Sequence, residues 1–326
     1  MVRAIMANEK GQQAVQAQAG IQAPAPGEVL IDVTHSSVNY KDAMAMSGRG
    51  IVRRWPLVLG IDAVGVVAES GSESFLPGDR VVLNGAGAGE DRDGGYAERF
   101  LAPAASLVRV PDRISLAQAA AIGTAGFTAA LAVLAVGDHG LAPGDGEVLV
   151  TGAAGGAGSI AISLLAGRGY KVVASTGRGE QEGAYLTGLG ATRILNRGEL
   201  SEPIAAPLQE QRWSAVIDAI GSNTLVNALA QTRYGGIAVS YGLAQGMDLP
   251  GTVLPFILRA VTLTGANSVD APAPLRERAW TMLGEEMNLD ALDAMTTTVG
   301  LTETLDLADL VLRGQVRGRS VVDVVR

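Results

Sequence analysis

The chain has 326 residues, of which 48% are hydrophobic, 18% are charged and 43 are glycine. This length predicts about two domains with a sizeable core, and the composition excludes a disordered protein. The lack of cysteine excludes disulfides, a thiolate nucleophile and a cysteine-rich zinc site, and the net charge of -8 argues against a general nucleic-acid or anionic-membrane surface.

The amino-terminal residues predict no export signal, because they lead directly into a strand-like run rather than a basic and then apolar segment. We therefore expect a cytoplasmic protein. The longest apolar stretch runs from Ala117 to Val136 and is interrupted by Gln118 and by glycines and threonines. We expect no membrane span there.

Residues 2–110 have the pattern of short strands separated by Gly and Pro. Strands are predicted at Val29 to Val33, Val64 to Ala68, Arg80 to Leu83 and Leu107 to Val110. The first part of the chain is therefore predicted to be β-rich.

After Asp112 the pattern changes to alternating helices and apolar strands, and Ser115 is suited to cap a long Ala-rich helix. Helices are expected at about 159–167, 181–189 and 223–232. Strands are expected at Val148 to Thr151, Lys171 to Ser175, Ala215 to Asp218, Ile237 to Tyr241 and Val261 to Gly265. This βαβ order predicts an α/β fold with a parallel, doubly wound sheet.

The last residues are too few and too mixed to form a third domain. Helices are predicted around Leu275 to Met287 and Leu305 to Val311, followed by a strand from Ser320 to Val325. We expect this segment to return to the first domain. The predicted domains are therefore 1–118 and 119–265, with 266–326 joining the first.

A glycine-rich turn follows the first strand of the expected parallel sheet. Gly152 ends the strand, and Ala154, Gly155, Gly156 and Ala157 lead into a helix. Glycines permit a tight turn and close approach of a diphosphate, and the amides at a helix start bind anions. The alternative is a tight turn that binds nothing.

The end of the next strand distinguishes NADP from NAD. Thr176 follows Gly152 by about 24 residues, near the spacing of about 20 at which an acidic residue binds the ribose of NAD. This sequence instead has Thr176, Gly177 and Arg178, with Arg197 further on. A hydroxyl and a guanidinium suit the 2′-phosphate, so we expect NADPH. A solvated loop side chain is the alternative for either arginine.

Seven segments resemble the zinc-free, quinone oxidoreductase-like branch of the medium-chain dehydrogenase/reductases. They are SVNYKD (37–42), PLVLGID (56–62), PGDR (77–80), GGYAE (94–98), IGTAGFTA (122–129), VTGAAGGAG (150–158) and LPFILR (254–259). The NYKD, IGTAGFTA and PFILR segments together are similar to the NADPH-dependent acrylyl-CoA reductases. The resemblance implies a GroES-like β-barrel catalytic domain plus a Rossmann domain, with the active site in the cleft between them.

The chain departs from the zinc alcohol dehydrogenases of this superfamily at the metal ligands. Asn39 replaces a cysteine ligand, and Ile61 and Asp62 replace a His-Glu pair. Without a Lewis acid to polarise an alcohol or carbonyl, we expect a conjugated double bond as the hydride acceptor.

The resemblance therefore implies hydride transfer from NADPH to the terminal carbon of an enoyl thioester, with acrylyl-CoA preferred, and protonation of the neighbouring carbon. Tyr40 is the expected donor to the transient enolate and a candidate proton source; packing against the nicotinamide is the alternative. Asn39 would orient the carboxamide or a backbone segment. Asp42 would form a local hydrogen bond, and Lys41 would be solvated or contact a phosphate.

The resemblance also implies cofactor contacts at matched positions. The diphosphate turn comprises Ala154, Gly155, Gly156 and Ala157, the adenosine phosphate end comprises Thr176, Gly177, Arg178 and Arg197, and the nicotinamide end comprises Tyr40, Leu243, Ile257 and Ser268. Thr124 and Thr128 would face the cleft or serve as core residues. Gly314 lacks the side chain that relatives carry at its position.

Arg49, Arg53 and Arg54 form a local basic cluster after the NYKD turn. The cluster would steer the phosphates of coenzyme A or be a solvated loop. His35 and His139 are isolated and are assigned no role, and no metal site is expected.

Two other functions remain open from the sequence. The same site would support reduction of a quinone or another small activated alkene, or the chain would bind NADPH without turnover. The strand Val261 to Gly265 is expected at a sheet edge, where a second copy would pair to form a homodimer.

Overall fold

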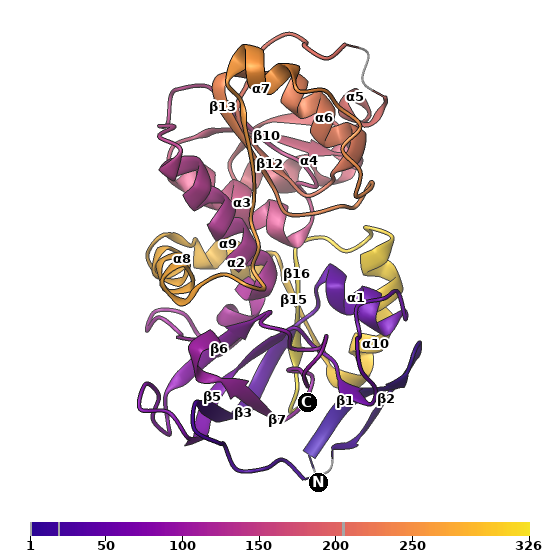
Figure 1. Cartoon of the computed structure of the whole chain (residues 1–326), viewed down its shortest axis with the longest axis vertical. Coiled ribbons are helices and arrows are strands. Elements are labelled where there is room, and N and C mark those ends of the chain that lie inside the picture. The colour runs from indigo at the N-terminus through magenta and orange to yellow at the C-terminus, as the bar shows by residue number, and fades with distance from the viewer. Residues whose placement is uncertain (1, 19, 204–205) are drawn as a thin grey trace. The chain divides into compact units, whose positions relative to one another are not determined.

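The pairing of strands separates an antiparallel part of the chain from a parallel part (Figure 1). The computed structural model describes residues 2–18, 20–203 and 206–326. It divides into two compact units. Unit 1 comprises Met1–Phe127, Ser268–Glu285 and Leu292–Arg326, and unit 2 comprises Thr128–Asn267 and Glu286–Ala291.

Unit 1 is built mainly from antiparallel strands. One sheet has the order β15-β16-β3-β5-β6-β8, with β7 also paired to β3, and a smaller sheet has the order β2-β1-β4. The bounds are β1 Val2–Glu9, β2 Gln12–Gln18, β3 Glu28–Ser37, β4 Leu57–Val58, β5 Asp62–Ser70, β6 Arg80–Asn84, β7 Arg99–Pro103, β8 Leu107–Arg109, β15 Thr296–Gly300 and β16 Arg319–Asp323. The four strands expected between residues 29 and 110 are confirmed, as is a carboxy-terminal strand.

Short helices pack on the strands of unit 1. They include α1 (Tyr40–Met46), the 3-10 helix η1 (Ala104–Ser106) and α10 (Leu301–Leu312). Met46 of α1 and Leu301 of α10 share one apolar core with Ile31, Leu83 and Phe100 of the strands. This core holds the amino end of α1 against β3 and β5. Two further helices, α8 (Ala273–Glu286) and α9 (Leu289–Ala294), precede β15 and α10 in the chain.

The longest helix, α2 (Leu116–Asp138), is broken at Gly123, where φ is 49° and ψ is -162°. Ser115 caps it as expected, since the Ser115 hydroxyl accepts from the Gln118 amide at 3.1 Å. By length and composition α2 could cross a membrane, whereas the polar residues and glycines that interrupt it predict no membrane span. However, 83% of its most apolar window is buried in the protein, as in the core helix of a soluble protein.

Unit 2 is a six-stranded parallel sheet with the order β11-β10-β9-β12-β13-β14. Its strands are β9 Glu147–Val150, β10 Lys171–Thr176, β11 Ala191–Asn196, β12 Trp213–Asp218, β13 Thr232–Ser240 and β14 Thr262–Gly265. Its helices are α3 Gly156–Gly167, α4 Gly179–Gly188, α5 Gly198–Ser201, α6 Ser222–Ala230 and α7 Leu254–Arg259. The five expected strands are confirmed. The expected strands did not include β11, in which only Ala191 and Leu195 are buried.

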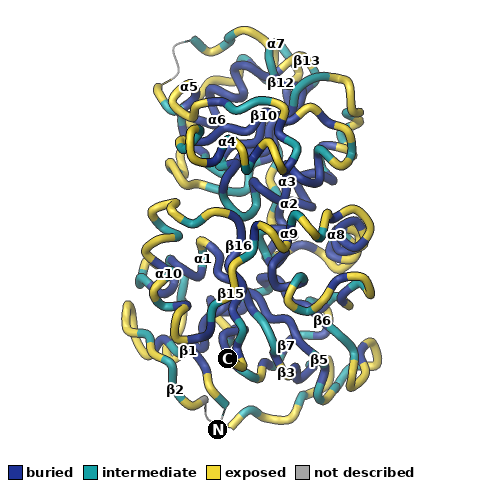
Figure 2. Tube along the Cα trace, turned by 180° about the vertical axis from the view of Figure 1, so that it is seen from behind, coloured by how far each residue is buried: buried dark blue, intermediate teal, exposed yellow. Residues whose placement is uncertain are grey.

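The middle of the parallel sheet is buried on both faces, and its strands accordingly have apolar residues at successive positions rather than at every second one (Figure 2). All six residues of β12 are buried. The strand order changes direction between β9 and β12, and ligands of such sheets bind at the carboxyl ends of the strands at this point.

Candidate active site

The glycine-rich turn joins β9 to α3 with backbone packed directly on backbone. Gly152 has φ 60°, and a Cβ on Gly158 would lie 2.5 Å from the Gly152 carbonyl oxygen. Because α3 begins at Gly156, the amides of its first turn lack partners within the helix. The structure therefore brings Ala154, Gly155, Gly156 and Ala157 together at the carboxyl edge of the sheet, in a turn whose geometry suits an anion.

The adenosine-side residues come together where β10 and β11 end. The Arg197 amide donates to the Thr176 carbonyl at 3.0 Å, and the Arg178 amide donates to the Thr176 hydroxyl at 3.1 Å. A Cβ on Gly177 would lie 2.5 Å from Nε of Arg197, so the arginine side chain lies across this glycine. Arg178 also forms an ion pair with Glu182 at 3.5 Å. Two guanidinium groups and a hydroxyl thus share one loop cluster.

Leu243 lies at the same edge of the sheet. A Cβ on Gly152 would lie 3.1 Å from Cβ of Ala219, and a Cβ on Gly242 would collide with the Ala219 carbonyl. The loops after β9, β12 and β13 are therefore in direct contact. Leu243, next to Gly242, is 51% exposed.

Ile257 lies at the other end of the strands. It belongs to α7, whose Arg259 donates to the carbonyls of Ala230 at 2.8 Å and Thr232 at 3.4 Å, where β13 begins. The structure does not bring Ile257 to the carboxyl edge. Ser268 belongs to unit 1, where it is 9% exposed.

In unit 1, Asn39 and Asp42 fix the start of α1. Asn39 is the N-cap residue, and its amide donates to Oδ2 of Asp42 at 2.9 Å. Oδ1 of Asp42 accepts from the Ile61 amide at 2.8 Å. Tyr40 is the first helical residue, and its side chain is 43% exposed. The phenol therefore projects from a rigid turn.

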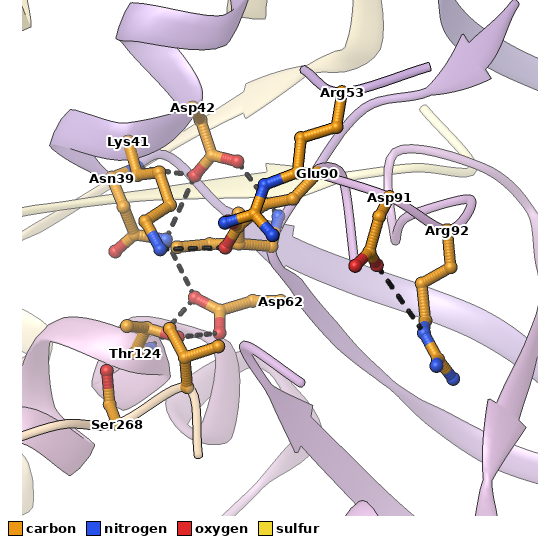
Figure 3. A network of polar contacts seen from close by, with 12 residues as sticks. Asn39, Lys41, Asp42, Arg53, Asp62, Glu90, Asp91, Arg92, Thr124 and Ser268 are labelled. Carbon is orange, nitrogen blue, oxygen red and sulfur yellow. Dashed lines mark hydrogen bonds and ion pairs between the residues drawn. The ribbon is translucent and has the colours of Figure 1, made fainter. Parts of the chain in front are cut away.

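Asp62, one of the two residues expected to replace a His-Glu pair, is the centre of a buried polar network (Figure 3). Its carboxylate accepts five hydrogen bonds: from Ser37 Oγ at 2.5 Å, Asn39 Nδ2 at 2.8 Å, Asn84 Nδ2 at 2.7 Å, and the amide and hydroxyl of Thr124 at 2.8 Å and 2.6 Å. These bonds occupy the lone pairs that a metal ion would need. Thr124 is therefore a network residue.

A buried arginine balances the charge of this network. Arg319 is 3% exposed and donates from Nε to the Ala121 carbonyl at 2.6 Å and from Nη2 to Oδ1 of Asn39 at 3.3 Å. Burial is the main cause that raises the pKa of Asp42 to about 7, with the charge of Asp62 second; donation from Ile61 and Asn39 opposes both. Asp42 thus titrates close to neutral pH.

The network contains residues that the sequence interpretation left without a role. In the sequence Asp62 stands out only as part of the pair that replaces His-Glu, and no local pattern points to Arg319. Asn39 uses its whole side-chain amide within the network, because Nδ2 also donates to Asp42 at 3.0 Å. The structure therefore favours the interpretation in which Asn39 orients a backbone segment.

The basic loop after α1 is partly neutralised by acidic neighbours. Lys41 donates to Glu90 at 2.7 Å, and Arg53 lies 3.9 Å from the same carboxylate (Figure 3). Arg54 pairs with Asp93 at 3.2 Å. The Arg53 side chain is still 70% exposed. Arg53 and the exposed Arg49 therefore remain accessible to an anion.

The remaining candidates have local structural roles. His35 contacts Thr34 at 2.9 Å, and burial is the main cause that lowers its pKa. His139 contacts the Gly235 carbonyl at 2.9 Å. Thr128 is buried in α2, and Gly314 has φ 65° just after α10.

The hydrogen-bond donors and cations of unit 2 fit the phosphates of a dinucleotide. The turn of unit 2 offers helix amides for a diphosphate, and the Thr176, Arg178 and Arg197 cluster offers cations for an additional phosphate. Among the described residues, no group of three or more His, Cys, Asp or Glu side chains is arranged to hold a metal ion.

Comparison with known proteins identifies both parts of the chain. Residues 25–112 match the alcohol dehydrogenase GroES-like domain, and residues 156–285 match the zinc-binding dehydrogenase domain. The acrylyl-CoA reductase AcuI of Ruegeria pomeroyi is 48% identical over 299 residues, covering 91% of this chain and 90% of the relative. The putative quinone oxidoreductase YhfP of Bacillus subtilis is 42% identical over 296 residues, covering 90% and 89%.

A solved structure supports the same relationship. The yhdH oxidoreductase of Salmonella enterica in complex with NADP has a TM-score of 0.95 at 43% identity, covering 99% of this chain and 100% of that one. The expected GroES-like and Rossmann folds are thereby confirmed. The chain belongs to the quinone oxidoreductase-like branch of the medium-chain dehydrogenase/reductase family.

Proposed function

We propose that the protein reduces the carbon–carbon double bond of a 2-enoyl-CoA thioester with NADPH, with acrylyl-CoA as the preferred substrate and propanoyl-CoA as the product. The observation that carries the proposal is the hydrogen-bonded Asp62, because a site without a metal-binding carboxylate suits an acceptor that is already activated by conjugation. The 48% identical relative named as an acrylyl-CoA reductase identifies that acceptor.

The proposed cofactor residues are those that unit 2 brings to the carboxyl edge. Bound NADPH supplies a hydride. Ala154, Gly155, Gly156 and Ala157 would bind its diphosphate through backbone amides. Thr176, Gly177, Arg178 and Arg197 would bind the 2′-phosphate, and Leu243 would contact the nicotinamide side.

Tyr40 is proposed as the hydrogen-bond donor to the thioester oxygen. When a hydride adds to the terminal carbon, the C=C π pair forms a new double bond to the carbonyl carbon, and the carbonyl π pair moves onto the oxygen, which gives an enolate. The Tyr40 hydroxyl would stabilise this negative charge, and a proton added to the neighbouring carbon completes the saturated acyl group. Asn39, Asp42 and Asp62 would hold the turn that carries the phenol, since they fix the start of α1.

The phosphates of coenzyme A would bind near the basic loop of unit 1. Arg49 and Arg53 are exposed, and their charge is only partly offset by Glu90. A positive loop beside the NYKD turn would raise the local concentration of an anionic substrate on a protein whose net charge is -8.

A quinone is the second candidate acceptor, because the putative quinone oxidoreductase YhfP is 42% identical. Oxidation of NADPH should be followed with acrylyl-CoA, with a quinone and with neither acceptor. We expect a far higher kcat/KM for acrylyl-CoA. A preference for the quinone would identify a quinone reductase, and NADPH binding without oxidation would indicate a protein that binds the nucleotide only.

We also propose a cytoplasmic homodimer without nucleic-acid or membrane partners. β14 lies at the edge of the parallel sheet. Exposed apolar side chains lie just before it in the chain, including Val253, Ile257 and Leu258 at 63%, 67% and 58% exposure. Sedimentation should show a dimer, and Ile257→Glu with Leu258→Glu should convert it to a monomer.

A further inference from the structure

Tyr241 directly follows β13 and carries a hydroxyl whose hydrogen-bonding capacity is unused. Its amide donates to the Asp218 carbonyl at 2.9 Å, which continues the pairing of β12 with β13. The hydroxyl oxygen is buried and has no hydrogen-bond partner among the described residues. Buried hydroxyls in proteins almost always have a partner. The phenol is therefore expected to bind a group that the chain does not supply.

Asp218, whose negative charge acts on Tyr241, already has hydrogen-bond partners. The Asp218 carboxylate accepts from the Thr151 hydroxyl at 2.6 Å and from the amides of Gly221 at 2.8 Å and Ile220 at 3.2 Å. Burial, and secondly the negative charge of Asp218, raise the pKa of Tyr241 above its usual value. The hydroxyl therefore keeps its proton at neutral pH and is available as a donor.

The place of Tyr241 in the sheet indicates which part of a dinucleotide it would meet. Thr176 ends β10, and Arg178 and Arg197 follow β10 and β11, on one side of the point where the strand order reverses. Tyr241 follows β13, on the other side. A dinucleotide that spans the carboxyl edge with its adenosine phosphate at the arginines has its nicotinamide half over β12 and β13.

The loops around Tyr241 are rigidly packed. A Cβ on Gly242 would collide with the Ala219 carbonyl, and one on Gly221 would collide with the Gly246 carbonyl. Gly221 has φ 73°, which favours glycine. The loop after β13 is therefore held against the loop after β12, and the residue before Gly242 cannot shift without displacing both.

We propose that the Tyr241 hydroxyl is a cofactor-binding group that donates a hydrogen bond to an oxygen atom of the nicotinamide riboside of bound NADPH. The inference rests on the proposed function for the identity of the cofactor. It adds a contact at the nicotinamide end, beside Leu243. It also explains why the side chain at this position carries a hydroxyl, although that hydroxyl is buried and has no partner among the described residues.

The test compares Tyr241→Phe with Tyr234→Phe, a matched control on β13 whose side chain is 74% exposed. Dissociation constants are measured by calorimetry for two probes, NADPH and 2′,5′-ADP, which lacks the nicotinamide half. For Tyr241→Phe we expect about a tenfold higher Kd for NADPH, because one hydrogen bond is lost, and an unchanged Kd for 2′,5′-ADP. Tyr234→Phe should change neither.

Thermal unfolding of the free protein supplies a readout that does not depend on activity. Removal of an unpartnered buried hydroxyl should leave the Tm unchanged or raise it by about 2 °C. An unchanged NADPH affinity in Tyr241→Phe would overturn the inference, and so would equal weakening of both probes with a lowered Tm. Failure of the unaltered protein to bind NADPH would instead contradict the proposed function.

Discussion

The side chain of Arg197 lies across the backbone of Gly177, so closely that a Cβ on the glycine would come within 2.5 Å of the arginine Nε. Arg197 follows β11 and Gly177 follows β10, and the amide of Arg197 donates to the Thr176 carbonyl at 3.0 Å. The glycine thus sets the path of the guanidinium over the residues proposed to bind the 2′-phosphate.

Gly177→Ala should therefore disturb cofactor selection without unfolding the protein. The added methyl group meets a flexible side chain rather than backbone, so Arg197 moves aside at little cost in stability. We expect the KM for NADPH to rise about tenfold, as for loss of one charge-assisted hydrogen bond, and the KM for NADH to stay constant. Gly179→Ala is the matched control, since its nearest contact would be Ile194 at 3.7 Å. Equal changes for both cofactors would argue against a 2′-phosphate role for Arg197.

Tyr40→Phe should lower turnover by roughly 10², because the phenol is proposed to donate to the oxygen that becomes negative in the transition state. The side chain is 43% exposed, so its removal should not destabilise the core. The kcat with saturating NADPH and acrylyl-CoA is the quantity to compare, with Tyr234→Phe as the exposed control. Turnover equal to that of the unaltered enzyme would leave Tyr40 with a packing role only.

Asp42 should make stability depend on pH near neutrality. Its pKa is raised in the folded protein from the usual 3.8 to about 7, mainly by burial. A group with a raised folded pKa contributes stability at low pH that is lost as pH rises through the folded value. Between pH 5 and 8 this contribution falls. The groups that face Asp42 are Asp62, Tyr96 and Arg319.

Asp42→Asn removes the titration, while the Asn amide oxygen can still accept a hydrogen bond. The Tm of the variant should therefore fall less between pH 5 and pH 8 than the Tm of the unaltered protein. Other titrating groups are common to both proteins and cancel in the comparison. Parallel pH profiles would show that the Asp42 carboxyl does not take up a proton in this range.

Neutralisation of Arg49 and Arg53 to glutamine should raise the KM for acrylyl-CoA several-fold and leave the KM for NADPH unchanged. The reason is loss of electrostatic attraction for coenzyme A, so the effect should shrink as salt is added. Arg313→Gln provides a control, because that arginine is also exposed, at 68%, at the end of α10. Identical KM values for acrylyl-CoA in both variants would place the coenzyme A phosphates elsewhere.

Local patterns were sufficient to predict most of the fold. The βα unit around Gly152 could be predicted, because glycine spacing and apolar periodicity are properties of neighbouring residues. The sequence does not predict β11, because Thr192 and Arg193 interrupt its apolar pattern, as is common for an edge strand.

The polar network could not be predicted in the same way. Asn39, Asp62 and Arg319 are distant in sequence and meet through the pairing of β3 with β5 and β16, and Thr124 joins them from the break in α2. Tyr241 was assigned to the end of a strand, but nothing in the sequence shows that its hydroxyl lacks a partner. The feature of the sequence that could have pointed to Tyr241 is a polar aromatic residue at the carboxyl end of a predicted parallel strand.

Transfer of label from NADPH deuterated at the reactive carbon to acrylyl-CoA tests the central claim most directly. We expect mass spectrometry to show propanoyl-CoA with one deuterium on its terminal carbon when the deuterium occupies the transferred position, and none when it occupies the other. Cofactor oxidation that yields no propanoyl-CoA, or propanoyl-CoA that is unlabelled with either form of the cofactor, would contradict direct hydride transfer to an enoyl thioester.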